Sequence, residues 1–317
     1  IAKSAGFCFG VKRAVNLVYD QVGNAKKVYT YGPIIHNEEV VSDLERKGVH
    51  VLSEEDIDAM LAHDGREDDA KEIVIRSHGI GRDAYKKLEQ LGFEIVDATC
   101  PFVKKIHRIV QEETEQGHCV VIVGDENHPE VCGIRGWCVR EPIIVNSVEQ
   151  AKKKLDFLDK NVYIVAQTTF NDVKFKDIVE FFRNKGYNVI VYNTICNATE
   201  ERQREARALA ADVDTMIVIG GKSSSNTQKL YEICRRECEN TYYIQTLVDL
   251  DLTVIESAKR VGITAGASTP NYIIKEVHDS MSELSFEQML EESLKTIHAG
   301  EVVEGTVIDV KPEEIIL

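Results

Sequence analysis

Short apolar runs rich in β-branched residues alternate with longer charged stretches of helical period along most of the chain. The apolar runs have the length and composition of buried strands, and in order they are KVYTYG, EIVIRS, EIVDAT, CVVIVG, VYIVAQ, NVIVYN, TMIVIG and GITAGA. A strand followed each time by a helix favours parallel sheets, because parallel strands need a long crossover connection. We therefore expect an α/β fold built from small parallel sheets.

One loop position recurs as a cysteine in three segments. Cys8, Cys100 and Cys196 lie 92 and 96 residues apart, and each stands between a strand-like run and a helix-like run. Two more positions recur in step: a glycine 24 residues after each cysteine, and a polar side chain four residues after the glycine. These positions are Gly32, Gly124, Gly220, His36, His128 and Ser224. The spacing predicts a threefold internal repeat.

A third loop completes each repeat, about 70 residues after its cysteine, and carries His78, Thr168 or Ser268. In parallel α/β units, ligands bind beyond the carboxyl ends of the strands, where helix N-termini present free N–H groups. Three pseudo-threefold-related α/β domains, arranged as a trefoil, would direct all nine loops at one centre. The expected domains are 9–99, 100–194, and 195–282 completed by an opening strand in 1–8, followed by a linker and tail at 283–317.

Composition and charge say more about the possible partners of the protein than about its fold. The 317 residues are 43% hydrophobic and 29% charged, which is ordinary for a globular protein of two or three domains. A net charge of -15 should repel nucleic acid and anionic membranes, so an anionic substrate needs a local site. No apolar run reaches the roughly 18 residues of a membrane span, and we expect a soluble, cytoplasmic protein without membrane partners. Eight cysteines are too sparse for a disulfide framework.

Three thiolates that converge in a protein interior need a compensating charge, which a soft metal centre supplies. Structural zinc usually takes four protein ligands, whereas a cubane of four irons held by three cysteines leaves one iron open to a substrate oxygen. The alternative is that the three are buried packing thiols. The other cysteines fall outside the repeat, and Cys234 and Cys238, four residues apart on a predicted helix, are interpreted as structural.

Polar loops beside the cysteines predict a phosphate-bearing ligand. The run GGKSSSN at 220–226 follows an apolar strand and opens a helix, so its N–H and hydroxyl groups can cradle phosphate. Histidines protonated beside an anion would add positive charge. Glu130, in NHPEV, could keep its proton near neutral pH and deliver it to a departing hydroxyl that Thr168 orients. Glu130 could equally well only complement the helix dipole.

Eight motifs in fixed order carry a family resemblance over about residues 1–282. GFCFGVKRA, HNEEVV, SHG, DATCPFVKKIH, HPEV, QTT, SSSN and AGAS resemble the 4-hydroxy-3-methylbut-2-enyl diphosphate reductases, iron-sulfur enzymes of the non-mevalonate isoprenoid pathway. The resemblance implies reductive removal of an allylic hydroxyl, giving isopentenyl and dimethylallyl diphosphates. It implies one 4Fe-4S cluster with an open iron, bound by Cys8, Cys100 and Cys196. Glu130, Thr168 and His128 would be catalytic, with Glu130 as the proton source. The residues that would bind substrate are His36, His78, His128, Thr168, Ser224, Ser225, Asn226 and Ser268.

The resemblance also implies an electron-carrier partner, either reduced ferredoxin or flavodoxin, and such carriers are usually acidic. Four basic residues follow two of the cysteines by four or five positions and could form a docking patch: Lys12, Arg13, Lys104 and Lys105. The third unit has Glu200 and Glu201 at the matching positions. A solvated helix face explains the basic residues equally well.

The tail departs from this family pattern. GEVVEGTVIDVKPEEIIL, residues 300–317, resembles the opening strands of a ribosomal-protein-type OB-fold, an RNA-binding module, but is too short to close a barrel. We expect a piece of a longer reductase fusion that could bind RNA only through a complete module. A non-catalytic alternative is an iron-sulfur sensor or RNA-binding, translation-linked protein with a reductase-like body. A zinc-bound sugar-phosphate enzyme is a third possibility.

Overall fold

The computed structural model describes residues 1–23, 26–62, 71–154, 160–251 and 258–281, together with two short strands near the end of the chain. The chain divides into two compact units, Ile1–Val277 and His278–Leu317. All three parallel sheets lie in the first unit.

The first sheet has the strand order β2-β1-β3-β4, with every neighbouring pair parallel. Its strands are β1 (Lys27–Tyr31), β2 (Val49–Leu52), β3 (Lys71–Ile75) and β4 (Glu94–Asp97), and its helices are α1 (Phe9–Gln21), α2 (Glu38–Arg46), α3 (Glu54–Ala62) and α4 (Arg82–Gln90). Along the buried strand β3, Val74 packs with the apolar faces of α1 and α2, whereas Ile73 and Ile75 pack with α3 and α4. The period-two alternation of a strand thus fills both faces of the sheet.

The second sheet repeats this order as β6-β5-β7-β8, again all parallel. Its strands are β5 (Cys119–Val123), β6 (Ile143–Val145), β7 (Asn161–Ala166) and β8 (Asn188–Val191), and its helices are α5 (Pro101–Glu115), α6 (Pro129–Arg135), α7 (Val148–Lys153) and α8 (Asp172–Asn184). Strand β5 alternates in the same way: Val121 packs with α8, and Ile122 packs with α5 and α6.

The third sheet is smaller, with the order β10-β9-β11. Its elements are β9 (Thr215–Ile219), β10 (Thr241–Ile244), β11 (Val261–Ala265), α9 (Asn197–Ala210) and α10 (Ser225–Glu237). The start of the chain lies along β11, where the N–H of Ala2 donates to the carbonyl of Ile263 at 2.8 Å. The opening strand that we expected there is not formed. A turn between Ala2 and Ala5 and a left-handed φ of 97° at Gly6 prevent a regular ladder.

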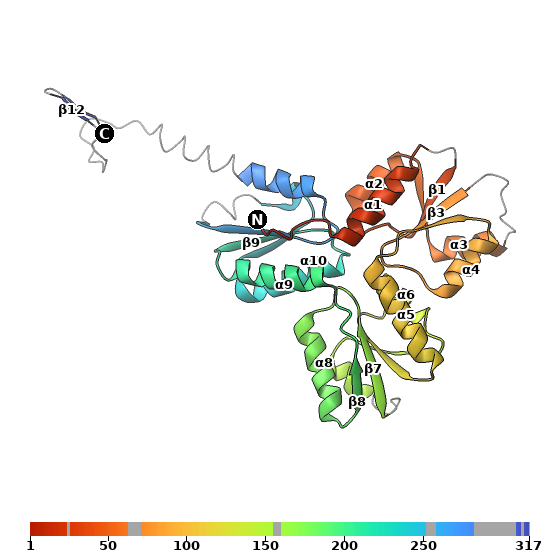
Figure 1. Cartoon of the computed structure of the whole chain (residues 1–317). Helices are drawn as coiled ribbons and strands as arrows, with labels where there is room; N and C mark the ends of the chain where they lie inside the picture. The colour runs from red at the N-terminus through yellow and green to blue at the C-terminus, as the bar shows by residue number, and fades with distance from the viewer. Residues whose placement is uncertain are drawn as a thin grey trace. The chain divides into compact units, whose positions relative to one another are not determined.

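Three lobes, each a sheet with its helices, meet at a common centre in Figure 1. The α/β class with small parallel sheets in a threefold arrangement is therefore confirmed. The three sheets fall within residues 9–99, 100–194 and 195–282, although the boundaries themselves stay a prediction.

The second unit adds little that bears on function. Its described strands, β12 (Asp309–Lys311) and β13 (Glu314–Ile316), pair as an antiparallel hairpin. Most of the predicted linker and tail lies outside the described residues, and a lone hairpin does not support the expected OB-fold. Among the helices that are described, none is both long enough and apolar enough to cross a membrane.

Candidate active site

The three repeat cysteines are the N-cap residues of three equivalent helices, α1, α5 and α9. The N–H of each donates to a carbonyl in the loop after β11, β3 or β7. The distances are 3.2 Å from Cys8 to Ala267, 3.0 Å from Cys100 to Ser77 and 3.1 Å from Cys196 to Thr168. One backbone contact, repeated three times, therefore holds each thiol at the positive end of a helix, where an anionic sulfur is favoured.

One central cavity is lined from all three lobes. Its walls include every residue that the sequence assigned to the site: Cys8, Cys100, Cys196, His36, His78, His128, Glu130, Thr168, Ser224, Ser225, Asn226 and Ser268. Helices α1 and α5 approach closely beside it, since a Cβ added to Gly10 would lie 2.7 Å from the Sγ of Cys100. Positions more than 200 residues apart in sequence are thus brought together, as the repeat predicts.

Burial makes two of the three thiols, Cys100 and Cys196, harder to ionise. Burial raises the pKa of Cys100 to about 11, an effect that the N–H groups of Phe102 and Val103 oppose and the neighbouring thiolates reinforce. Burial also raises the pKa of Cys196, whose Sγ lies 3.1 Å from the hydroxyl of Thr199. Three thiols that line one cavity fit a thiolate-bound metal centre, whose soft cation compensates their charge. Cys234 and Cys238, by contrast, are buried in the core of the third lobe, as expected for structural thiols.

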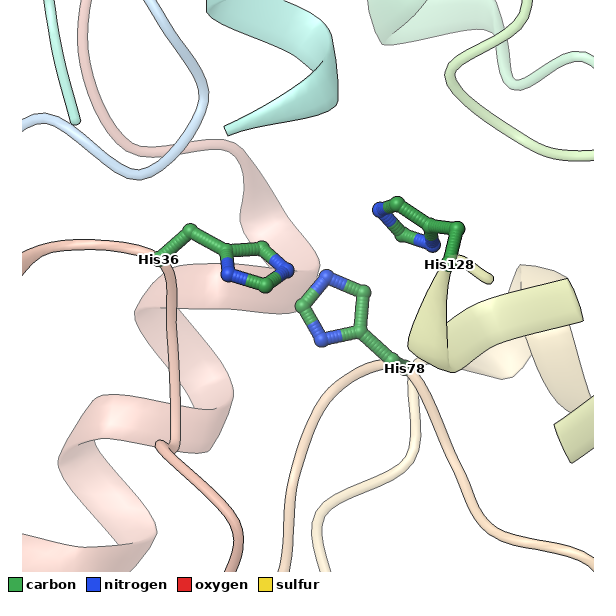
Figure 2. Close-up of side chains that lie close together, drawn as sticks. All are labelled: His36, His78 and His128. Atoms are coloured by element: carbon green, nitrogen blue, oxygen red, sulfur yellow. The ribbon is translucent and has the colours of Figure 1, made fainter. Parts of the chain in front are cut away.

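Figure 2 shows three histidine rings that point toward one another, from the loops after β1 and β3 and from the start of α6. The ring centroids lie 4.7 Å apart for His36 and His78, 5.4 Å for His78 and His128, and 5.6 Å for His36 and His128. Burial, together with the charge of Arg76, lowers the pKa of His36 to about 4. Burial lowers the pKa of His128 to about 4 and that of His78 well below its usual range. All three imidazoles are therefore neutral at pH 7.

Three neutral imidazoles with ligand atoms all within 4.8 Å of one another could in principle hold a metal ion. The hydrogen bonding of His128 argues for an anion instead. The N–H of Glu130 donates to Nδ1 of His128 at 3.1 Å, so the proton of the neutral ring must lie on Nε2. Nε2 is then a donor toward the cavity, which suits a phosphate oxygen. Among the described residues, no group bonds to the buried Nε2 of His36 or Nδ1 of His78.

The start of α10 contributes further donors. Ser224 caps the helix and accepts from the N–H of Thr227 at 3.3 Å, while the hydroxyl of Ser268 links Ser224 to the carbonyl of His36. Asn226 is 4% exposed, and neither end of its side-chain amide has a partner among the described residues. An unsatisfied amide in the first turn of a helix, next to serine hydroxyls, is well suited to an anion.

Glu130 is 1% exposed, and Thr168 bonds to both of its carboxyl oxygens. Burial raises the pKa of Glu130 to about 7, although the N–H and hydroxyl of Thr168 act in the opposite direction. A carboxyl that titrates near neutrality can hold and release a proton at physiological pH. The structure thereby brings together the proton donor, the histidines and the thiols of the sequence-based hypothesis.

Two arginines at this cavity, the half-buried Arg76 and the buried Arg202, were missed by the sequence analysis. The guanidinium of Arg76 lies over the ring of Tyr31 and fills the space left by the absent side chain of Gly32, whose φ is 64°. Arg202 lines the cavity itself and is 4% exposed. Neither position carries an arginine in the other two repeats, so the repeat could not reveal them, and a single arginine in a sequence looks like a surface residue.

Comparisons with known proteins agree with this site. The family model described as LytB protein matches residues 1–282. A curated relative from Caldanaerobacter subterraneus subsp. tengcongensis is named 4-hydroxy-3-methylbut-2-enyl diphosphate reductase. It is 48% identical to this chain over 90% of this chain and 97% of its own length. A relative of the same name from Clostridium acetobutylicum is 42% identical over 100% of this chain but only 50% of its own length. A solved structure of the reductase that is the terminal enzyme of the non-mevalonate pathway has a TM-score of 0.63 at 42% identity, covering 89% of this chain and 98% of that chain. The chain therefore belongs to the LytB protein family.

Proposed function

We propose that the protein is a 4-hydroxy-3-methylbut-2-enyl diphosphate reductase. It replaces the allylic hydroxyl of the substrate by hydrogen, consuming two electrons and two protons and releasing water, to give isopentenyl and dimethylallyl diphosphates. The observation that carries the proposal is the single cavity in which three helix-capping thiols, a neutral histidine triad and a carboxyl with a pKa near 7 all meet. Curated relatives 43–48% identical to this chain bear that enzyme name.

The cofactor we propose is one 4Fe-4S cluster bound by Cys8, Cys100 and Cys196. The donor set fits, because three soft ligands at helix N-termini favour an iron-sulfur centre over a hard cation. When bound, such a cluster supplies electrons and a Lewis-acidic iron that lacks a cysteine ligand.

The diphosphate would be held by two sets of donors that face the cavity. The first set is the histidine triad, His36, His78 and His128, whose rings are neutral before the anion arrives and offer N–H groups to it. The second is the helix start and its neighbour: Ser224, Ser225, Asn226 and Ser268. Neutral donors compensate an anion less than cations do, so Arg76 and the α10 dipole add positive potential.

Glu130 would deliver the proton that turns the departing hydroxyl into water. Its carboxyl is held by Thr168 on one side, and its backbone N–H is fixed by His128 on the other. The hydroxyl of Thr168 donates to Glu130 and can accept a hydrogen bond from the hydroxyl of the substrate. Thr168 would in this way orient the leaving group toward the proton source.

Anaerobic turnover tests the proposal. Purified protein with reconstituted iron and sulfide, reduced methyl viologen and the allylic diphosphate should form both isomeric diphosphates, which can be quantified by chromatography. The visible and spin-resonance spectra should change when substrate is added. A colourless zinc protein without turnover would favour the sugar-phosphate alternative, and an iron-loaded protein that converts no substrate would favour the sensor.

The electron donor we propose is reduced ferredoxin or flavodoxin, docking near the start of α1 and α5. Of the four basic residues expected there, Arg13 donates to the carbonyls of Asp97 and Thr99, and Lys104 pairs with Asp97 at 2.5 Å. Lys12 and Lys105 are exposed. We therefore expect the salt-sensitive part of docking to depend mainly on these two lysines.

Two wider proposals concern the setting of the enzyme. Eight cysteines in 317 residues are too few for a disulfide framework, which suits a reducing compartment, and we propose the cytoplasm. RNA binding through an OB-fold in the tail stays a prediction, because the family match ends at residue 282.

A further inference from the structure

Arg202 is a buried cation without a carboxylate partner among the described residues. Its Nε and Nη2 donate to the carbonyl of Ser4 at 2.8 and 2.5 Å, and Nη2 also donates to the carbonyl of Gly6 at 2.8 Å. The nearby carboxylate of Glu205 is occupied elsewhere, accepting from the N–H groups of Lys3 and Ser4. A buried guanidinium satisfied only by carbonyls is costly unless an anion lies close by.

Several anionic groups act on Arg202: the thiolates of Cys8 and Cys196 when ionised and, to a smaller extent, the carboxylates of Glu205 and Glu201. Burial lowers the pKa of Arg202, and the charges of Cys8 and Cys196 are the largest effects that oppose this. Arg202 stands six residues after Cys196 on α9, and its guanidinium holds the loop at residues 4–6 that leads into Cys8. One side chain thus joins the helix that Cys196 caps to the loop that leads into Cys8.

The position of Arg202 breaks the threefold symmetry of the site. The matching residues six positions after the other two cysteines are Ala14 and Ile106, both fully buried and apolar. The residue three positions after Cys196 also differs, being Thr199, whose hydroxyl lies 3.1 Å from the sulfur, where the other repeats have valine. At these two positions the Cys196 repeat is therefore polar and carries one positive charge, whereas the Cys8 and Cys100 repeats are apolar.

We propose that Arg202 is the fixed counter-charge of the cysteine site, and that it raises the reduction potential of the cluster bound there while joining the Cys8 loop to α9. The inference rests on the proposed function, since it assumes a redox centre at these thiols. A reduced centre carries one more negative charge than an oxidised one. A nearby cation that cannot lose its proton stabilises the reduced state.

The test compares Arg202→Met, which removes the charge, with Arg202→Lys, which keeps the charge but loses the planar fork. Arg204→Met is the matched control, because it removes one positive charge from an exposed position two residues away on α9. Each variant is reconstituted anaerobically, its iron content is measured, and its midpoint potential is determined by dye-mediated titration. Hydrogen exchange of the amides of residues 2–8 reports on the loop.

Arg202→Met should lower the midpoint potential by about 59 mV, which for one electron shifts the equilibrium about tenfold toward the oxidised cluster. Arg202→Lys should keep a midpoint potential near the wild-type value, but the amide hydrogens of residues 2–8 should exchange faster in it than in wild type. Arg204→Met should change neither the potential nor the exchange. If Arg202→Met binds no iron, while Arg202→Lys binds iron and has the wild-type midpoint potential, the positive charge at this position is still what the cluster requires. An iron-loaded Arg202→Met of unchanged potential would overturn the proposal, as would loss of iron from both variants. Failure of the proposed function would show differently, as a wild-type protein that binds iron at a normal potential but converts no substrate.

Discussion

Thr168 binds both carboxyl oxygens of Glu130, one through its N–H at 2.5 Å and the other through its hydroxyl at 2.7 Å. Two donors on one carboxylate would by themselves lower its pKa, and desolvation is what reverses the outcome. The pair therefore combines a fixed orientation with a proton that is available near pH 7. This combination is what a proton donor to a departing hydroxyl requires.

Glu130→Gln should abolish proton delivery without disturbing the geometry. Gln has nearly the same shape but no acidic proton, so we expect turnover with reduced methyl viologen to fall about 100-fold or more. The affinity for substrate, measured anaerobically by the change in the visible spectrum, should stay within about threefold, because the diphosphate donors are unchanged. Turnover close to the wild-type rate would remove Glu130 from the mechanism.

Thr168→Val should move the pH profile as well as lower the rate. The hydroxyl of Thr168 lowers the pKa of Glu130, so its loss leaves the pKa higher than about 7. A proton donor loses activity as pH rises through its pKa, and the alkaline limb should therefore shift to higher pH in the variant. Thr168→Ser keeps the hydroxyl and should keep the wild-type limb. A limb at the same pH in all three proteins would contradict this assignment.

The carboxyl of Glu130 should also make the free energy of unfolding depend on pH. Because the pKa of Glu130 is raised from 4.5 to about 7 on folding, the folded protein binds a proton more tightly than the unfolded chain. The free energy of unfolding should therefore decrease as pH rises from about 4.5 to 7, by about 3 kcal/mol for this group alone. Denaturant unfolding of wild type and Glu130→Gln in the same metal state should show a difference that grows over this range. Parallel pH curves for the two proteins would contradict the prediction.

The positions after the strands could be predicted from sequence, because topology alone decides where they lie. In a parallel sheet every strand ends at the same edge, so His36, His78 and Cys100, which follow β1, β3 and β4, had to meet once the strands were recognised. The repeat added the other two sheets, since Thr168 and Cys196 follow strands of the second sheet, and Ser224 and Ser268 follow strands of the third, at corresponding positions.

What the sequence could not reveal are contacts that no local pattern encodes. The bonds from Arg202 to Ser4 and Gly6 join residues 198 and 196 positions apart, and no periodicity marks such a pair. The opening segment was expected as a strand, but whether Gly6 adopts a positive φ depends on what the surrounding chain requires. The charge state of His36 likewise depends on burial and on Arg76, which is distant in sequence.

Gly10→Ala should impair cluster binding without unfolding the protein. Gly10 has helical backbone angles in α1, where alanine is intrinsically more favourable by about 1 kcal/mol, yet its Cβ would lie 2.7 Å from the Sγ of Cys100. We expect the thiol to be displaced and the iron content after reconstitution to fall, while the melting temperature of the iron-free protein changes little. Asn16→Ala, at an exposed position of the same helix, serves as control. Full iron occupancy in Gly10→Ala would show that Cys100 can move aside.

Diphosphate binding should be coupled to proton uptake by the histidine triad. Burial lowers the pKa of His36 to about 4, so the ring is neutral before the ligand arrives, and an anion beside it stabilises the protonated form. The affinity for inorganic diphosphate, measured by calorimetry, should therefore rise more steeply between pH 8 and pH 6 in wild type than in His36→Asn. The protonation of the ligand itself is the same in both proteins and cancels in the comparison. Ser225→Ala should weaken binding about equally at both pH values, because a serine hydroxyl does not titrate. Identical pH slopes in wild type and His36→Asn would mean that His36 binds the anion as a neutral donor throughout.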